Sequence, residues 1–532
     1  MRFTVAKERE TFWHLSQLTV ILAIAACVRF YQLDYLSLSA NEIANIGVCN
    51  ASNWLGLAVN QRVLNGMPFV YPFLLCDTTA WLGNSEFMVR LPSALAGTAV
   101  IFVIYRIGRD FFSPVSGLLS AALIATAHTP VVASRETDLY AFLLLFVIFH
   151  TYCFFHIVFT PDNAAAAPVS IQHRGASWNL AWSWRSGFAG KEGFLLGFWC
   201  SGALAFYTSY MAAIPLAMEC IVTLFYLRKP AAVALWKPLL VVIALWIPIL
   251  LSFWKWISTG HFFTLQDTGR IKQIIRALFI ENSLLLNVLL ASAALTLVLC
   301  LVQRFSRNTE DETTSCSAFF ICLLFLAGML TAFFLPSIST NNYIFWSAIF
   351  FLIAPYPVAI LIRHIPLPAL QQTLVIILLI GITALQTRTL YDNGAFTHEV
   401  NADFRLATKI VHDDKNFMEG NRTIILNSGL FNHYLERFDL KNAVHLQANS
   451  ESAEDTLHGL LADNVFYYLE YQGSDRNLEH DSPLYTTLSS RYRQLCQSRI
   501  PWVRIIKFSG VDPEPGTSAP DCQAHLAGVV SL

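Results

Sequence analysis

Residues 29–140 contain the side chains that could take part in a chemical reaction. Asn41 and Glu42 lie in a polar segment just after the first apolar run. Acids, arginines and prolines at one end of membrane helices indicate an enzyme that handles a polar head group at the bilayer surface, because a protein that merely fills lipid has no use for them. The other members of this set are the proline cluster Met67-Pro68-Phe69-Val70-Tyr71-Pro72, the run Arg90-Leu91-Pro92-Ser93-Ala94, and Arg135, Glu136, Asp138 and Tyr140 between two later apolar runs.

The composition indicates a membrane protein. Of the 532 residues, 55% are hydrophobic and 13% are charged, whereas soluble domains carry about 25% charged residues. The 40 Phe, 13 Trp and 18 Tyr suit lipid-facing and interfacial positions. A basic block for nucleic acid, a Cys/His spacing for zinc and a phosphate-binding glycine loop are all lacking in the sequence. We therefore expect no nucleic-acid partner and no cofactor, and we assign no metal-ligating residues. Dependence of the activity on a divalent metal stays open at this point.

The apolar runs predict a polytopic α-helical protein with about eleven transmembrane helices of roughly 20 residues each. The apolar segment 68–82 is short and holds Pro68, Pro72 and Asp77, so we expect it to be re-entrant or interfacial. We interpret the first run as a retained signal anchor with the N-terminus in the cytoplasm. The expected spans lie near residues 12–29, 91–107, 115–133, 139–159, 192–208, 211–227, 236–255, 285–303, 317–335, 343–362 and 371–387.

Lys and Arg concentrate in short cytoplasmic loops, and most of the predicted inner loops follow this rule. Two predicted outer loops depart from it: residues 30–90, with Arg62 and Arg90, and residues 256–284. Cations kept on the outer side indicate an anionic ligand there, and solvated surface charge is the alternative.

The composition changes near residue 391, where short apolar runs alternate with helical patterns. An odd number of spans places this part on the outer side, so we expect a transmembrane domain over residues 1–390, with the outer loop 30–90, and an extracytoplasmic α/β domain over 391–532. Cys496 and Cys522 of that domain could pair in an oxidising compartment. The expected strands lie at 424–426, 444–446, 465–469 and 503–506, and the expected helices at 432–438, 453–461 and 483–498.

The order of these motifs resembles the GT-C glycosyltransferases, and more narrowly a bacterial branch akin to protein O-mannosyltransferases and the aminoarabinose transferase of lipid A. The resemblance covers about residues 20–160 and is only architectural beyond them. It rests on Arg29-Phe30-Tyr31-Gln32-Leu33, Asn41-Glu42, the proline cluster, Gly83-Asn84-Ser85-Glu86, residues 90–97 (Arg90 to Gly97), Tyr105-Arg106-Ile107-Gly108-Arg109 and residues 134–141 (Ser134 to Ala141).

The resemblance implies a transferase of the bacterial inner membrane that moves a sugar from a polyprenyl-phosphate donor to an extracytoplasmic glycan, lipid or protein. Such a reaction needs cations for the phosphate leaving group and a carboxylate for the acceptor proton. Glu42, Asn41 and Asp138 are the expected catalytic positions. The expected substrate-binding positions are Arg62, Arg90, Arg135, Glu136, Tyr140 and Tyr343.

The chain departs from the family pattern where its base is expected, because the family has Asp-Glu and this chain has Asn41-Glu42. Asn cannot accept a proton at neutral pH. Glu42 could have taken over, another acid (Asp138, Glu136 or Asp77) could serve, or the chain could be catalytically impaired. The proline cluster also begins with Met67 in place of His, and Asn341-Asn342-Tyr343 lacks the neighbouring cation that the family often has.

Structural roles compete with these assignments. Glu42 could cap a helix, Arg135 and Glu136 could form an ordinary ion pair, Arg90 could reach the head groups, and Tyr343 could be an interfacial aromatic. Asp138 could stabilise the start of a helix through the helix dipole.

Three functions account for these features to different degrees. A glycosyltransferase explains the polar outer loop, the outer cations and the outer domain. A degenerate relative that binds a lipid-linked sugar or scaffolds polysaccharide assembly is favoured by Asn41. A transporter should carry midplane charges, broken helices and internal repeats. Spans 317–335 and 371–387 lack charge and the two halves do not look alike, which disfavours it.

Overall fold

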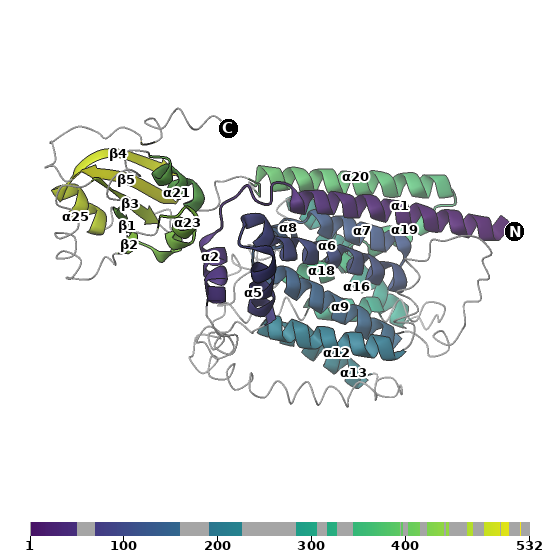
Figure 1. Cartoon of the computed structure of the whole chain (residues 1–532). Coiled ribbons are helices and arrows are strands. Elements are labelled where there is room, and N and C mark those ends of the chain that lie inside the picture. The colour runs from purple at the N-terminus through teal and green to yellow at the C-terminus, as the bar shows by residue number, and fades with distance from the viewer. Residues whose placement is uncertain are drawn as a thin grey trace. The chain divides into compact units, whose positions relative to one another are not determined.

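The computed structural model describes two compact units of the chain (Figure 1). The first consists of Met1–Tyr31, Ala51–Asn84 and Met88–Asn393, and the second of Gln32–Asn50, Ser85–Phe87 and Gly394–Leu532. The residues described are 2–50, 70–159, 191–225, 283–305, 317–326, 344–393, 395–396, 403–414, 423–440, 443–445, 465–471, 483–500, 502–509 and 522.

The first unit is helical. Its described elements are α1 (Arg2–Phe30), α5 (Val70–Leu82), α6 (Glu86–Phe111, whose first two residues belong to the second unit), α7 (Pro114–Thr126), α8 (His128–Arg135), α9 (Tyr140–Phe159), α12 (Lys191–Thr208), η2 (Tyr210–Ala212), α13 (Ala213–Phe225), α16 (Ser283–Phe305), α18 (Ile344–Ile353), α19 (Tyr356–Arg363) and α20 (Pro368–Asp392).

The apolar helices confirm the expected polytopic membrane protein. Among the described residues, five helical stretches are long and apolar enough to span a membrane, or six if the bent pair α7 and α8 counts as one span. The short α5 covers the segment that the sequence predicts to be re-entrant or interfacial. The expected span 236–255 lies outside the described residues.

The predicted span 115–133 is broken in the structure. α7 ends at Thr126, Ala127 adopts an extended conformation, and α8 leaves at an angle of 57°. Pro130 lies in the first turn of α8, where its missing N–H costs little. The break leaves backbone carbonyls at the end of α7 that need donors.

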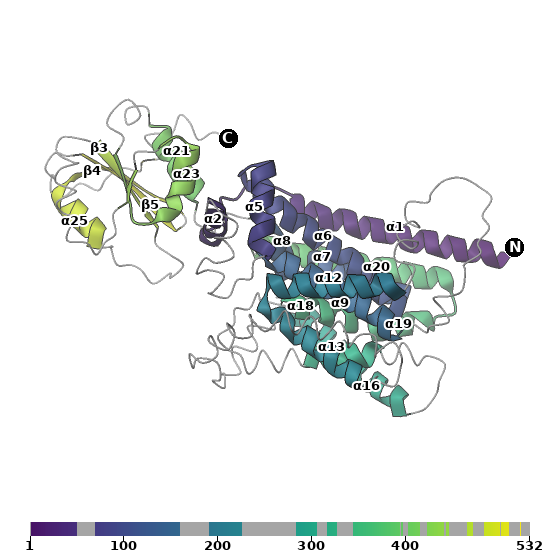
Figure 2. The ribbon, with the colours of Figure 1, turned by 60° about the horizontal axis from the view of Figure 1, so that its bottom comes forward.

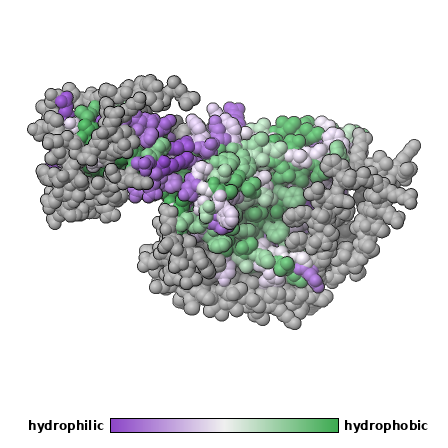
Figure 3. Space-filling view, in the orientation of Figure 1, coloured by the Kyte–Doolittle hydropathy of each residue, from purple (hydrophilic) through white to green (hydrophobic). Residues whose placement is uncertain are grey.

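α9 lies at the centre of the bundle, and α1 and α20 lie at its periphery. α9 contacts α12, α13, α18 and α8, whereas α1 and α20 each flank α7 (Figures 1 and 2). Exposed apolar side chains on these outer helices, such as Val20, Ile377 and Ile380, suit contact with lipid. Figure 3 shows mostly apolar side chains on the visible described face of this unit.

A buried polar pair joins α9 to α13. His150, in the middle of α9, has its Nε2 atom 2.8 Å from Oε2 of Glu219. The other ring nitrogen, Nδ1, lies 2.8 Å from the carbonyl of Phe198 on α12, and Thr151 donates a 2.9 Å hydrogen bond to the second carboxylate oxygen. This pair and the bend between α7 and α8 both lie outside the two spans, 317–335 and 371–387, whose lack of charge disfavours a transporter.

The second unit contains the predicted α/β domain. Its described elements are α2 (Ala40–Gly47), η1 (Val48–Asn50), α21 (Phe404–His412), β1 (Thr423–Leu426), η6 (Gly429–Phe431), α23 (Asn432–Arg437), β2 (Ala443–His445), β3 (Val465–Tyr471), α25 (Pro483–Arg491), β4 (Arg493–Ile500) and β5 (Val503–Ser509). The strand order is β2-β1-β3-β5-β4. β1 pairs in parallel with β2 and β3, and β5 runs antiparallel to both β3 and β4.

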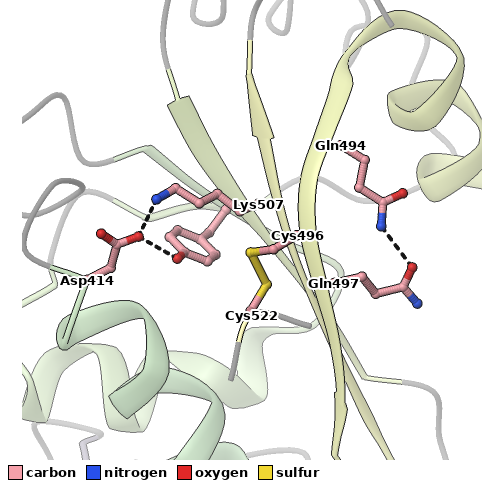
Figure 4. The surroundings of a disulfide bond; sticks show 7 residues. Asp414, Gln494, Cys496, Gln497, Lys507 and Cys522 are labelled. Carbon is pink, nitrogen blue, oxygen red and sulfur yellow. Dashed lines mark hydrogen bonds and ion pairs between the residues drawn. A yellow bond between two sulfur atoms is a disulfide. The ribbon is translucent and has the colours of Figure 1, made fainter. Parts of the chain in front are cut away.

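Alternating side chains cover the two faces of the sheet. Phe466 and Tyr468 of β3 pack with Leu484 and Leu488 of α25. Tyr467, the residue between them, donates a 2.7 Å hydrogen bond to Asp414, just after α21. Asp414 also pairs with Lys507 of β5, so both strands are tied to the end of α21 (Figure 4). Burial, together with the hydrogen bond to Asp414, raises the pKa of Tyr467.

The predicted helix 483–498 is wrong in its second half, where the chain forms β4. Cys496, Ser498 and Ile500 alternate as buried positions, which is the period of a strand. Pairing with β5 therefore overrides the local helical pattern. Cys496 forms a disulfide with Cys522, as Figure 4 shows, with their Cα atoms 5.0 Å apart.

Candidate active site

The candidate residues fall in both units. Asn41 and Glu42 belong to the second unit, whereas Arg90, Arg135, Glu136, Asp138 and Tyr140 belong to the first. Arg62 and Tyr343 lie outside the described residues.

Glu42 has a structural role at the start of α2. Its Oε2 atom accepts a 2.8 Å hydrogen bond from the backbone N–H of Ser39, and the Ser39 hydroxyl accepts one from the N–H of Glu42. This reciprocal arrangement is a capping box, which satisfies two donors that a helix start leaves free. Glu42 is 1% exposed. One carboxylate oxygen thus holds the helix start, which fixes the side chain in one orientation.

Asn41 lies beside this cap but is exposed. It occupies the second position of α2, where an aspartate would also be favoured by the helix dipole. Asn41 therefore places an uncharged side chain at an accessible site, and its expected catalytic role stays a prediction.

Arg135 reaches the end of α1 from α8. Its Nη1 atom donates to three carbonyls, those of Val28 (3.1 Å), Arg29 (3.3 Å) and Tyr31 (2.7 Å). The last carbonyls of a helix need such donors, and a cation also complements the helix dipole there. This contact gives Arg135 a structural role in addition to its predicted role in substrate binding.

Arg29 makes the reciprocal contact at the break between α7 and α8. It is 1% exposed and donates from Nη1 to the carbonyl of Ala125 at 2.7 Å. Its Nε atom lies 3.3 Å from the hydroxyl of Ser134, which itself donates to the carbonyl of Pro130 at 2.5 Å. The arginine that closes the first span therefore supplies the donors that the helix break requires.

Gly97 of α6 packs against this polar contact. A Cβ atom at Gly97 would lie 1.9 Å from the Ser134 hydroxyl oxygen, 2.6 Å from its Cβ and 3.2 Å from Nε of Arg29. The glycine of the Arg90–Gly97 motif is thus explained by the close approach of two helices.

Replacing Gly97 by Ala is expected to destabilise the protein by about 3 kcal/mol, because the inserted methyl must displace two buried polar side chains. The measurement is the free energy or midpoint of unfolding in detergent. The matched control is Gly381→Ala in α20, where a Cβ would meet nothing within 4 Å. That control should be neutral or stabilising by up to about 1 kcal/mol, and equal effects at the two sites would contradict the packing argument.

The first unit holds two buried arginines, one near the start of α6 and one at the end of α8. Arg90 is 3% exposed and Arg135 is 7% exposed, and their positive charges interact electrostatically. Like charges repel more strongly in a poorly solvated environment than in water. An anion bound beside them would offset that repulsion.

Glu136, Asp138 and Tyr140 lie at the start of α9 and are all half-buried. Asp138 Oδ1 accepts a 2.7 Å hydrogen bond from the N–H of Leu139, directly before the helix. Its carboxylate is therefore placed where the helix dipole favours negative charge. Its catalytic role remains a prediction.

Sequence reasoning assigned no role to Glu86, His150 or Glu219. Glu86 is 2% exposed and contacts Arg405, Arg437 and Tyr434. His150 and Glu219 were visible as ionisable residues in predicted spans, which is the signal that could have singled them out. The partners of Glu86 could not be inferred, because they lie more than 300 positions away in the chain.

Part of the chain matches a mannosyltransferase family model, and its fold matches solved structures of ArnT. Residues 67–165 match the family model described as dolichyl-phosphate-mannose-protein mannosyltransferase. The crystal structure of ArnT from Cupriavidus metallidurans in the apo state has a TM-score of 0.53 at 13% identity, over 94% of this chain and 99% of that one. The same protein bound to undecaprenyl phosphate has a TM-score of 0.51 at 12% identity, with the same coverage. No curated protein sequence matches. The fold predicted from the sequence, that of the GT-C glycosyltransferases, is confirmed.

Proposed function

We propose that this GT-C membrane protein is a glycosyltransferase that moves a sugar from a polyprenyl-phosphate donor to an extracytoplasmic glycan, lipid or protein. The observation that carries the proposal is the agreement of fold over nearly the whole chain with ArnT, one of whose structures is bound to undecaprenyl phosphate. The family model adds support over residues 67–165, which include Arg90, Arg135 and Asp138.

The proposed reaction is a single displacement at the anomeric carbon of the sugar. The acceptor oxygen or nitrogen forms the new bond to this carbon, while the bond from the carbon to the phosphate oxygen breaks and the lipid phosphate leaves with the electron pair. The acceptor proton passes to a carboxylate. Arg90 and Arg135 are suited to the phosphate, since the leaving group would bring negative charge to two buried cations.

Four carboxylates are candidates for the group that accepts the proton. Glu42 is our first choice because the capping box holds its side chain in one orientation at the start of α2. Asp138 and Glu136 are the alternatives near the arginines in the sequence, and Asp77 is exposed on α5. Arg62 and Tyr343 remain candidates for donor binding.

We place the α/β domain of the second unit on the extracytoplasmic side of a bacterial inner membrane. The Cys496–Cys522 disulfide supports this placement, because disulfides persist in oxidising compartments such as the periplasm. The N-terminal segment carries Arg2, Lys7 and Arg9 before its apolar run, which favours a cytoplasmic N-terminus.

The test compares surface glycans and lipid-linked sugars of cells that lack the chain with those of complemented cells, by mass spectrometry. We expect one sugar residue to disappear from a surface glycan, lipid or protein and the corresponding polyprenyl-phosphate sugar to accumulate. Wild-type protein should reverse both changes. Unchanged products in the deletion strain would contradict the proposal.

A second function is favoured by Asn41, which removes the expected aspartate from an accessible site. A degenerate relative would bind a lipid-linked sugar or scaffold polysaccharide assembly without transfer. Such a protein would restore the glycan equally well with Glu42, Asp138, Glu136 or Asp77 each replaced by its amide.

A further inference from the structure

Glu86 is the buried centre of an ion-pair network in the second unit. Its Oε2 atom lies 2.6 Å from Nη1 of Arg437 on α23, and its Oε1 atom lies 3.3 Å from Nη1 of Arg405 on α21. Tyr434, also on α23, donates a 3.2 Å hydrogen bond to Oε1. Removing one partner of a buried charge network is costly, because the other charges are left uncompensated.

Tyr434 connects this network to the segment before α2. Its hydroxyl oxygen accepts a 2.8 Å hydrogen bond from the N–H of Leu38 and a 3.3 Å bond from the hydroxyl of Ser37. Burial raises the pKa of Tyr434, so its hydroxyl stays protonated and can donate to Glu86 while it accepts from Leu38. The chain reaches Ser39, the capping residue of α2, directly after Leu38.

Arg405 holds the same segment a few residues earlier. Its Nη1 atom donates to the carbonyl of Asp34 at 2.9 Å, its Nη2 atom donates to the carbonyl of Tyr35, and its backbone N–H donates to the hydroxyl of Ser37 at 3.2 Å. α21 and α23 therefore both contact Glu86. Both also form hydrogen bonds with the segment that leads into α2.

α21 is itself fixed at both ends. Asp403 caps its start by accepting a 2.9 Å hydrogen bond from the N–H of Leu406. Asp414, after its end, is bound by Tyr467 and Lys507 of the sheet, as Figure 4 shows for the ion pair with Lys507. In addition, α2 contacts η6, which precedes α23. A continuous series of hydrogen bonds and ion pairs thus runs from the sheet through α21, Glu86 and α23 to the segment before α2.

We infer that Glu86 is a positioning residue that orients α2, and with it Asn41 and Glu42, through Tyr434 and Arg405. The inference rests on the proposed function, since it assigns to the C-terminal α/β region the task of holding the candidate base in place for sugar transfer. Misplacement of a reacting group by about 1 Å can cost about 100-fold in rate, so a base on a short helix needs such a series of contacts.

The test uses full-length protein in lipid nanodiscs and compares wild type with Glu86→Gln. Gln keeps the shape and an acceptor for Tyr434 but removes the charge that both arginines need. We expect backbone amides of residues 39–47 to exchange hydrogen for deuterium about tenfold faster or more. The kcat for sugar transfer should fall by about tenfold or more, while the KM for the polyprenyl-phosphate sugar stays within about twofold.

Three further variants sharpen the test. Tyr434→Phe keeps both ion pairs and removes only the hydroxyl that links Glu86 to Leu38, so it should shift exchange and kcat in the same direction even if Glu86→Gln folds poorly. Arg437→Lys keeps the charge beside Glu86 and should retain most of the activity. Asp392→Asn removes an acid from an exposed ion pair on α20 and should change neither readout.

Unchanged exchange in residues 39–47, or an unchanged kcat, in both Glu86→Gln and Tyr434→Phe would overturn the inference. A uniform rise in exchange that includes β3 and β5, with KM and kcat affected alike, would assign Glu86 to general stability and would also overturn it. The variants could show faster exchange only in residues 39–47 while the wild-type protein transfers no sugar. That result would refute the proposed function and would still support the positioning of α2.

Discussion

Replacing Glu42 by Gln is expected to lower the rate of sugar transfer by about 100-fold or more, because it removes the group proposed to accept the acceptor's proton. The structure indicates that Gln can replace Glu42 without loss of the helix cap. A capping box accepts Gln as well as Glu at this position, so the amide oxygen can still accept the hydrogen bond from the N–H of Ser39. The measurement is single-turnover transfer from a polyprenyl-phosphate sugar by purified protein.

Ser39→Ala is the matched control for Glu42→Gln. It removes the capping hydroxyl, at a cost of about 0.5–2 kcal/mol in helix stability, but leaves the carboxylate in place. We expect it to retain transfer within a few fold. Asn41→Asp should be neutral or raise the rate, since it restores the acid that the family pattern has. If Glu42→Gln transfers at the full rate and Asp138→Asn does not, the base is Asp138 and the proposed reaction class stands.

Replacing Glu219 by Leu is expected to destabilise the helical unit by about 3 kcal/mol or more, because it leaves His150 and Thr151 buried without their acceptor. Nδ1 of His150 faces a carbonyl and Nε2 faces a carboxylate. The measurement is the free energy of unfolding in detergent.

The double variant His150→Leu with Glu219→Leu tests whether the loss of stability in Glu219→Leu arises because His150 is left buried without its partner. Because apolar replacement of both members of a buried pair is often tolerated, the double variant should be more stable than Glu219→Leu alone. Arg388→Gln, which breaks an exposed pair on α20, should change the stability by less than about 1 kcal/mol. A Glu219→Leu protein as stable as wild type would show that the pair is dispensable for folding.

The sequence by itself determined the features that contiguous residues encode. Apolar runs of membrane-spanning length predicted the polytopic helical unit, and short apolar runs predicted β1, β2, β3 and β5. The order of Arg29, Asn41-Glu42, the Arg90–Gly97 run and residues 134–141 predicted the GT-C fold. Helix and strand periods, and the length needed to cross a bilayer, are local properties, so a single sequence carries them.

Only the tertiary structure decided how the motif residues are used. It paired Glu86 with Arg405 and Arg437, which lie 319 and 351 positions away, and it turned residues 493–500 into β4 against their local pattern. It also engaged one oxygen of Glu42 in a cap and set Arg29 and Arg135 against the carbonyls of other helices. A buried polar group takes whichever partner the fold brings near it, and that partner has no fixed spacing in the sequence.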